Sequence, residues 1–485
     1  MSRAPDGEMR MARESGFEFE RGELQELGYK VVDAIADRLT SMRDLPLSIE
    51  TSRDAMEALL REPMPREPGD VVEVIEDAVR DVLGHALPID HPRFFAFVPS
   101  PMTYVSVLAD MLVAGWNPFV GSWLASSGPS MVELIVLDWL REACGLAASA
   151  RGVLTSGGSS ANLTCLQVAR DRREEAEHAR LVAYYSDQTH SSVERALKTL
   201  GIHTDRRREL PSDGSFCLDP GSLREAIDAD IERGLVPWCV IANAGTTNTA
   251  AVDPLGPIGA LCRERSMWMH IDGAYGASAA LCDEGSELLE GMGLGDSLVL
   301  DPHKWLFQSY EIGCAFIREG HLLEETFGVM ADYMKDVVAQ EGHVNFRDRS
   351  LQLSRSFRAL KLWMTFKVYG SETLARWIER GIDNARYAQR CIESLSSWRV
   401  VTGASLGVVT FRHEPDGMGP DEADAHNDAI AREMLRSQVA FVTSTRLRDR
   451  TVQRLCTIHP CTDEKDLGAL CEAFDTTARR LRANA

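Results

Sequence analysis

A lysine at the end of an apolar run is the first residue in this chain whose position suggests chemistry. The chain has seven lysines, and Lys304, within the segment Asp301–Trp305, directly follows the apolar run Ser297–Leu300. An amine held where a buried strand ends is partly desolvated, so it is more easily neutral and nucleophilic. A surface lysine after a strand is the simpler interpretation of this residue taken alone.

An acidic residue follows another apolar run, in the segment His270–Tyr275. At such a strand end, Asp272 could pair with a protonated ring nitrogen and so keep a heterocyclic ring cationic. The small residues Gly273 and Ala274 would let a flat ring approach closely. The alternative is an aspartate that caps a turn.

Glycines and hydroxyl side chains stand between an expected strand and an expected helix, in the segment Thr155–Asn162. Gly157 and Gly158 let backbone N–H groups converge, and a helix N-terminus favours an anion. Ser159 could both cap the helix and bind a phosphate. A capped turn that binds nothing is the alternative, because such turns are common.

A histidine follows the apolar run Leu181–Ser186, in the segment Asp187–Ser192. The imidazole of His190 could stack on an aromatic ring and shuttle protons, or it could be an ordinary histidine near a helix N-terminus. All four segments are expected at the carboxyl ends of parallel strands, where ligands of such sheets bind. An anion cradle, a stacking group, an acid and a lysine are together the set that pyridoxal 5′-phosphate (PLP) needs.

The elements that must position these groups follow an alternating pattern between residues 145 and 320. Strand-type runs are expected at 151–155, 181–186, 236–243, 268–271, 297–300 and 313–317, and helices between them at 160–173, 193–200, 221–233 and 255–265. This alternation predicts an α/β fold, with a mostly parallel sheet and helices on both faces.

The two ends of the chain follow other patterns. Apolar residues at helical spacing predict helices at 24–39, 55–60 and 71–83, a set too exposed to stand alone. After a long helical stretch around 360–395, strands are expected at 407–412, 439–445 and 452–458, and helices at 424–436 and 467–483. We therefore predict an N-terminal helical segment (1–95), a large α/β domain (96–375) and a small C-terminal α+β domain (376–485).

Composition excludes several classes of partner. The net charge of −21 over 485 residues argues against nucleic acid and anionic membranes. The uncharged stretch 111–132 contains Asn117, Pro118 and Pro129, which would leave backbone groups unsatisfied in lipid, so we reject it as a membrane span. The eleven cysteines are scattered without a zinc spacing, which predicts reduced thiols, a cytoplasmic protein and no metal site.

Seven segments together give the chain a family resemblance from about Leu24 to Thr462. It resembles the group II PLP-dependent decarboxylases, which include the aromatic-L-amino-acid and glutamate decarboxylases. The segments are HPRFFAF (91–97), TSGGSSANL (155–163), DQTHSSVERA (187–196), NAGTTNT (243–249), HIDGAYG (270–276), DPHKWL (301–306) and SRSFRALKLW (354–363).

The resemblance implies a role for each matching residue. Lys304 would be the Schiff-base lysine, Asp272 the partner of the pyridine nitrogen, and His190 and Ala274 the neighbours of the two ring faces. Matching residues for the phosphate and the ring edge are Gly157, Gly158, Ser159, Thr247 and His303. Tyr333 resembles the loop tyrosine that returns a proton to the substrate carbon, and matching positions for substrate contacts are Phe97, Ser100 and Ser354.

The resemblance further implies the type I PLP fold and a homodimer with active sites at the subunit interface, the N-terminal helices packing on the partner. It implies decarboxylation of an L-amino acid, with aromatic substrates such as tyrosine, DOPA or tryptophan favoured by the segments around His190 and Ser354. Asp301 departs from the pattern, because well-known animal members carry Asn there, and so does Ser356, where many relatives carry Arg. Val98 and Gly121 replace bulkier residues.

Other functions stay open at this point. Glutamate or 2,4-diaminobutyrate could be the substrate, although we can place no cationic pocket group for glutamate. An oxidative aromatic aldehyde synthase would have lost the loop tyrosine or the stacking histidine, and this chain keeps both Tyr333 and His190. A non-catalytic binding protein on the same fold is the remaining alternative.

Overall fold

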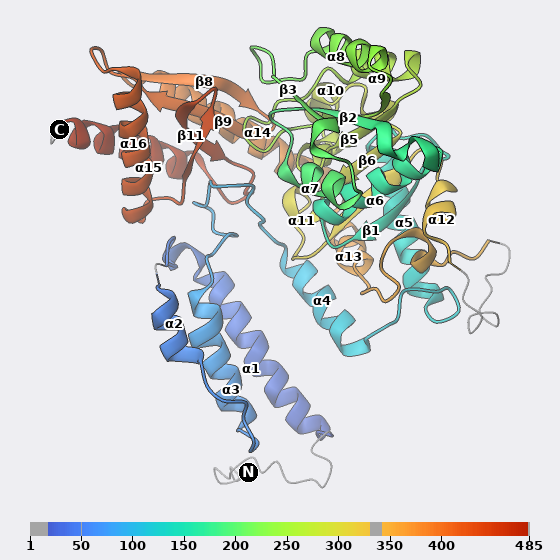
Figure 1. The fold of residues 1–485 in the computed structure, drawn as a ribbon. Coiled ribbons are helices and arrows are strands. Elements are labelled where there is room, and N and C mark those ends of the chain that lie inside the picture. Colours follow the sequence, from blue (N-terminus) through green and yellow to red (C-terminus); the bar gives the residue numbers. More distant parts are fainter. Residues whose placement is uncertain (1–17, 50, 330–341, 484–485) are drawn as a thin grey trace, which may run out of the picture.

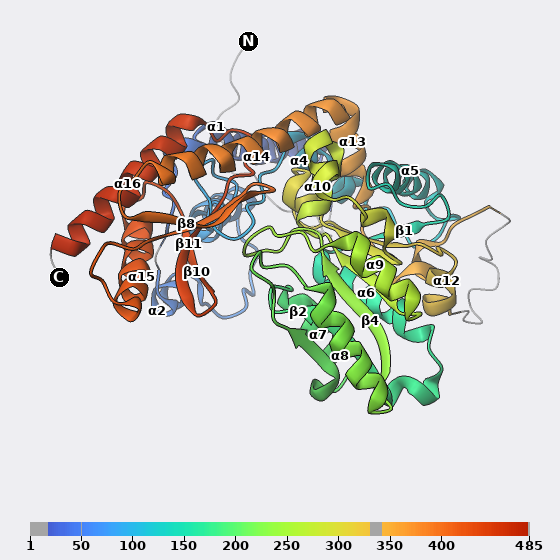
Figure 2. The same cartoon turned by 90° about the horizontal axis from the view of Figure 1, so that it is seen from above.

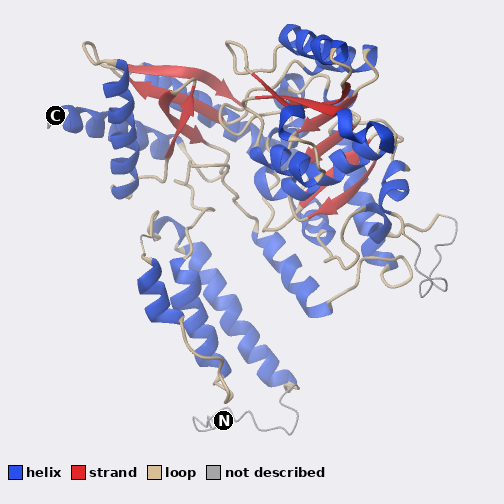
Figure 3. Ribbon diagram, viewed as in Figure 1, coloured by secondary structure: helices blue, strands red, loops and turns tan. Residues whose placement is uncertain are grey.

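The computed structural model describes residues 18–49, 51–329 and 342–483. Its larger sheet has seven strands in the order β1-β7-β6-β5-β4-β2-β3 (Figures 1 and 3). β2 to β6 pair in parallel, whereas β7 is antiparallel to both β6 and β1. The mostly parallel α/β sheet is thus confirmed. The strands are β1 (Arg151–Thr155), β2 (Leu181–Ser186), β3 (Arg207–Leu210), β4 (Val236–Asn243), β5 (Trp268–Asp272), β6 (Ser297–Leu300) and β7 (Gly313–Ile317).

The direction of β7 differs from the alternating pattern expected for this region. Between β6 and β7 the chain forms only the four-residue helix α11 (Pro302–Trp305). A parallel return needs a crossover that runs back along the whole strand, usually through a longer helix. The chain therefore turns directly into an antiparallel neighbour. Because β1 is antiparallel to β7, it runs in the same direction as β6, and its end meets the same edge of the sheet.

Helices pack on both faces of the sheet. Alternate residues of β2 point to opposite faces, as in any strand. Ala183 belongs to a core cluster with residues of α7 (Ser191–Thr199), whereas Tyr184 belongs to a cluster with residues of α8 (Pro220–Glu232). Further helices of this part are α4 (Tyr104–Trp116), α5 (Ser127–Ala143), α6 (Gly158–Asp171), α9 (Leu255–Glu264), α10 (Asp283–Leu288), α12 (Leu322–Phe327) and α13 (Ala359–Tyr369).

The C-terminal part contains a second, antiparallel sheet of four strands in the order β10-β11-β9-β8 (Figure 2). β8 was not expected from the sequence, and the predicted run 439–445 overlaps β10 only partly. Its apolar residues instead join the N-terminal part of the chain, where Phe441 bridges to Phe94 and their rings stack at 4.8 Å. The elements are α14 (Ser371–Glu393), β8 (Trp398–Ser405), β9 (Val408–His413), α15 (Pro420–Arg436), β10 (Thr443–Leu447), β11 (Arg450–Cys456) and α16 (Glu464–Ala483).

Three N-terminal helices lie apart from both sheets (Figures 1 and 3): α1 (Arg21–Thr40), α2 (Arg53–Leu60) and α3 (Val71–Asp77). None of their described residues is buried. Apolar side chains such as Leu24, Tyr29 and Val74 are instead exposed. Arg38 ties α1 to Asp90 through two hydrogen bonds of 2.6 and 2.9 Å. Among the helices described here, none is both long and apolar enough to cross a membrane.

Candidate active site

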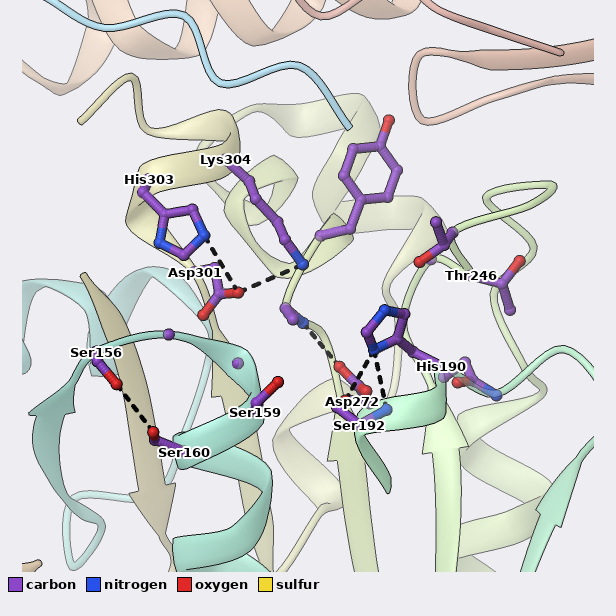
Figure 4. Close-up of a pocket in the computed structure, with 17 residues that line it drawn as sticks. Ser156, Ser159, Ser160, His190, Ser192, Thr246, Asp272, Asp301, His303 and Lys304 are labelled. Atoms are coloured by element: carbon purple, nitrogen blue, oxygen red, sulfur yellow. Dashed lines mark hydrogen bonds and ion pairs between the residues drawn. The ribbon is translucent and has the colours of Figure 1, made fainter. Parts of the chain in front are cut away.

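One cavity of about 340 Å³ opens at the carboxyl ends of β1, β2, β4, β5 and β6 (Figure 4). Nine of the residues singled out in the sequence line it, although they come from segments far apart in the chain. These are Gly157, Gly158, Ser159, His190, Thr247, Asp272, Ala274, His303 and Lys304. The convergence expected from the strand ends therefore occurs.

The glycine turn leads from β1 into α6, which begins at Gly158. The N-cap is Gly157, and no side chain caps the helix, so the expectation that Ser159 caps it is wrong. The free N–H groups of the first turn are therefore available to an anion. A Cβ at position 158 would lie 2.8 Å from Asp301 Oδ2, so only glycine fits here without displacing a neighbour.

A fully buried ion pair holds the strand before this turn. Arg355 Nη2 lies 2.6 Å from Glu133 Oε1, and both side chains have no exposed surface. Glu133 accepts a hydrogen bond from the Leu154 N–H, while Arg355 donates to the Leu154 carbonyl at 2.7 Å. Both backbone polar groups of Leu154 are thereby fixed one residue before Thr155, where β1 ends.

Asp272 is buried and fully hydrogen-bonded at the end of β5. One carboxylate oxygen accepts from the Ala274 N–H and the other from Asn162 Nδ2, each at 3.1 Å. Asn162 in turn accepts from His270 Nε2 at 2.8 Å, while His270 Nδ1 lies 2.8 Å from Ser297 Oγ. Burial lowers the pKa of His270 to about 4, so its ring is neutral. This chain of neutral partners fixes the orientation of the carboxylate.

His190 is the N-cap residue of α7, and its ring lines the cavity. Its Nδ1 accepts from the Ser192 N–H at 3.2 Å and lies 2.8 Å from the Ser192 hydroxyl. Burial is the main cause that lowers the pKa of His190. The neutral ring therefore carries its proton on Nε2. Because Asn162 also donates to Ser192 Oγ at 3.0 Å, His190 and Asp272 share one hydrogen-bond network.

Lys304 lies on α11, where its amine reaches back into the cavity. Figure 4 shows Asp301 between Lys304 and His303: the Asp301 Oδ2 atom lies 3.3 Å from Lys304 Nζ and 3.7 Å from His303 Nε2. Burial is the main cause that lowers the pKa of His303, and its Nδ1 lies 2.6 Å from the Ile312 carbonyl oxygen. The same Nδ1 also lies 3.4 Å from the Ile312 nitrogen. The contact with the carbonyl oxygen is the shorter one and a carbonyl only accepts, so Nδ1 carries the proton of the neutral ring.

The residue after the lysine anchors α11 in the core. Trp305 is fully buried, and its ring stacks on Tyr275 at 5.3 Å with an interplanar angle of 6°. A Cβ at Gly381 of α14 would lie 3.2 Å from the same indole, and one at Gly407, just before β9, would lie 3.4 Å from it. The absence of side chains at these two glycines lets the C-terminal part close on Trp305.

The predicted substrate residues lie apart from this group. Ser100 is buried, and its hydroxyl donates to the His303 carbonyl. Phe97 and Ser354 are exposed, and none of the three lines the cavity. Tyr333 lies outside the described residues. Within the parts of the chain that the structure describes, no group of three or more His, Cys, Asp or Glu side chains is placed to hold a metal.

Sequence reasoning gave no role to Arg454, a buried residue of β11. Its Nε donates to the carbonyl oxygens of Thr247 and Asn248 at 2.8 and 3.1 Å, and its Nη1 donates to that of Phe97. Arg454 thereby holds the loop that carries Thr247 against the cavity. Arg454 lies in a strand of mixed polar and apolar residues, so its local sequence gave no pattern that could have identified it.

The groups present fit PLP. The open N-terminus of α6 suits a phosphate, the fixed carboxylate of Asp272 suits a pyridinium nitrogen, and Lys304 supplies an amine for the aldehyde. A model of the pyridoxal-dependent decarboxylase conserved domain matches residues 54–414. The chain belongs to this family. PLP is accordingly its cofactor, and the group II resemblance is confirmed.

Similar proteins extend over nearly the whole chain. An aromatic-L-amino-acid decarboxylase of Bacillus atrophaeus is 40% identical over 92% of this chain and 93% of its own length. A phenylacetaldehyde synthase of Arabidopsis thaliana is 31% identical over 91% of this chain and 93% of its own length. The crystal structure of Oryza sativa TDC with PLP and tryptamine superposes with a TM-score of 0.91 at 26% identity, covering 96% of this chain and 99% of that one. This family fold agrees with the predicted fold type I.

Proposed function

We propose that this PLP-dependent decarboxylase removes the carboxylate of an aromatic L-amino acid and releases the amine and CO₂. The observation that carries the proposal is the meeting of Lys304, Asp272 and the N-terminus of α6 in one cavity. The similarity to an aromatic-L-amino-acid decarboxylase supports the substrate class.

Each residue has a task in this reaction. Lys304 would attach the cofactor, Asp272 would pair with its ring nitrogen, and the first turn of α6 would hold its phosphate. When bound, PLP supplies an electron sink for the bond that breaks as CO₂ leaves. His190 presents a neutral Nε2–H to the cavity, which suits it to hold a proton near the reacting carbon without adding charge. We propose that Tyr333 returns the proton to that carbon.

The alternatives differ in what they leave behind. An aldehyde synthase, the activity named for the Arabidopsis relative, would produce aldehyde and hydrogen peroxide in place of amine. A glutamate or 2,4-diaminobutyrate decarboxylase would prefer an acidic or a diamino substrate. A binding protein would release no CO₂ at all.

A panel of substrates distinguishes these candidate activities. CO₂ release would be followed for L-tyrosine, L-DOPA, L-tryptophan, L-glutamate and L-2,4-diaminobutyrate, with amine, aldehyde and hydrogen peroxide quantified in the same samples. We expect stoichiometric amine and CO₂ with at least one aromatic substrate. Preference for glutamate or diaminobutyrate, aldehyde as the main product, or no turnover on any substrate would each refute the proposal.

The assembly and location of the protein are further proposals. We propose a homodimer with active sites at the subunit interface, because α1 to α3 leave apolar side chains uncovered within one chain. We also propose the division into residues 1–95, 96–375 and 376–485, with the first segment packing on the partner. The scattered, odd number of cysteines supports a cytoplasmic location.

A further inference from the structure

Asp301 is a buried carboxylate that lines the cavity and has no task in the chemistry above. The residue is 2% exposed. Its Oδ2 atom faces Lys304 and His303, whereas its buried Oδ1 atom has no hydrogen-bond partner among the described residues. A buried polar oxygen without a partner costs free energy, so a hydrogen-bond partner from a bound ligand would stabilise this atom.

The Asp301 carboxylate packs against the glycine turn at the start of α6. A Cβ at Gly158 would lie 2.8 Å from Asp301 Oδ2, and one at Gly313 of β7 would lie 2.7 Å from Oδ1. Asp301 therefore fills the space between the N-terminus of α6 and β7. This is also the place where the phosphate of the cofactor is expected.

The charges around Asp301 do not accommodate a further anion. The turn 156–160 has no ionisable side chain. The ionisable groups that line the same cavity are His303 and Lys304 (α11), Asp272 and Tyr275 (at and after the end of β5) and His190 (α7), and Cys314 (β7) also interacts with Asp301. Burial lowers the pKa of both histidines and raises the pKa of Tyr275 and Cys314, so these four groups are neutral.

Two carboxylates and a single ammonium then remain in the cavity. A phosphate monoester adds nearly two further negative charges at neutral pH. The helix N-terminus offsets only about half a charge. Moreover, the neutral His303 ring turns its unprotonated Nε2 toward Asp301 Oδ2 at 3.7 Å, which places two hydrogen-bond acceptors face to face.

We propose that Asp301 receives the phosphate as a neutral carboxylic acid, so that binding of PLP takes up about one proton. The proton comes from solvent, joins the carboxylate and is donated from its O–H group to a phosphate oxygen. The inference rests on the proposed cofactor site. It predicts that affinity for phosphorylated ligands falls as pH rises, by up to about tenfold per pH unit for the uptake of one proton.

The test uses the full-length apoprotein and 4-deoxypyridoxine 5′-phosphate, which has no aldehyde and so cannot bond to Lys304. Calorimetry in buffers of different ionisation enthalpy, at pH values from about 7.5 to 9 where the phosphate is a dianion, counts the protons taken up. Wild type is compared with Asp301→Asn. The unphosphorylated compound, 4-deoxypyridoxine, serves as the matched ligand control.

We expect wild type to take up about one proton more than Asp301→Asn with the phosphorylated ligand, and the two proteins to agree with the control ligand. The variant should bind more tightly at pH 9 and vary less with pH. Infrared difference spectra of wild type labelled with ¹³C-aspartate should gain a carboxylic-acid C=O band on binding. This measurement decides the matter by itself if the variant does not fold.

Two results would overturn the inference: equal proton uptake in both proteins, or no new carboxylic-acid band in wild type. A failure of the cofactor site looks different, because neither protein would then bind the phosphorylated compound. Binding without Asp301-dependent proton uptake would refute only the role of Asp301.

Discussion

Some side chains of this site have very few polar partners, and Lys304 is the clearest example. Among the described residues, it is the one lysine that lines the cavity, and Asp301 is the only carboxylate within 4 Å of its amine. Removing the Lys304 amine should therefore remove the covalent attachment of the cofactor without disturbing the core.

We expect Lys304→Ala to lose the visible absorption band of lysine-bound PLP and its decarboxylase activity. Borohydride reduction followed by peptide mapping should label Lys304 in wild type and no peptide in the variant. Lys198→Ala, an exposed change on α7, is the control and should keep both band and label. A label on another lysine of wild type would contradict the assignment.

Tyr333 can be tested from the sequence-based hypothesis alone. If its hydroxyl returns the proton, Tyr333→Phe should lower the rate of amine formation by roughly 10²- to 10⁴-fold and raise the yield of aldehyde. Product ratios measured by chromatography on an aromatic substrate check this. An unchanged ratio of amine to aldehyde would count against the role.

His270 should make the fold sensitive to acid. Its pKa is about 4 in the folded protein and near 6.5 in an unfolded chain, so the unfolded state binds the extra proton. The neutral ring of His270 therefore costs no stability above pH 6.5. As pH falls from 6.5 toward 4, the free energy of unfolding decreases by up to about 3 kcal/mol. Urea unfolding at several pH values should show a flatter profile for His270→Gln than for wild type, whereas the exposed His321→Gln should keep the wild-type slope.

Elements, rather than residues, were the most predictable part of the molecule. The strands that end at the cavity were all expected, because apolar runs bounded by polar turns mark buried parallel strands. β3 and β8 escaped notice, since both are only partly buried and contain polar residues such as Arg207, Arg208 and Thr402. The direction of β7 was missed because it depends on the length of a connection and not on its own sequence.

The candidate site was likewise predictable only in part. Residues at strand ends could be placed, since the ends of parallel strands meet at one edge. Their supporting partners could not, because the contacts of Asn162 with Asp272 and of Arg454 with the Thr247 loop join distant segments. The substrate residues also could not be placed, because Phe97 and Ser354 lie outside the cavity of one chain.

The ion pair behind β1 gives a prediction at this scale. Glu133→Gln leaves the Arg355 guanidinium buried without its counter-charge, which should lower the free energy of unfolding by about 3–5 kcal/mol. The exposed pair of Glu57 with Arg53 provides the control, and Glu57→Gln should cost less than about 1 kcal/mol. Urea denaturation measures both. Equal effects of the two substitutions would show that the buried pair does not hold the strand.

At the scale of the whole molecule, the uncovered apolar side chains of α1, α3 and α4 predict self-association. Trp116 on α4 is 78% exposed, although tryptophan is among the residues most favoured at protein interfaces. None of the residues of α1, α2 and α3 is buried, so their apolar side chains need another surface to pack against.

We expect a truncated protein that lacks residues 1–90 to sediment as a monomer, or to dissociate at a much higher protein concentration than the full chain. Trp116→Glu should weaken the dimer while leaving the circular dichroism spectrum unchanged. Leu288→Glu, on the exposed side of α10, is the control for an apolar-to-charged change. Sedimentation velocity checks all three, and a truncated protein that stays dimeric and active would refute the interface.

The packing around Trp305 links motion of the C-terminal part to the position of Lys304. The Trp305 indole stacks on Tyr275 and packs against the chain at Gly381 and Gly407, and the preceding residue is Lys304. A hinge motion between the two sheets would therefore displace the amine of Lys304. Substitutions that change the substrate preference should therefore be tolerated best in segments that do not contact the indole, because they leave the amine in place.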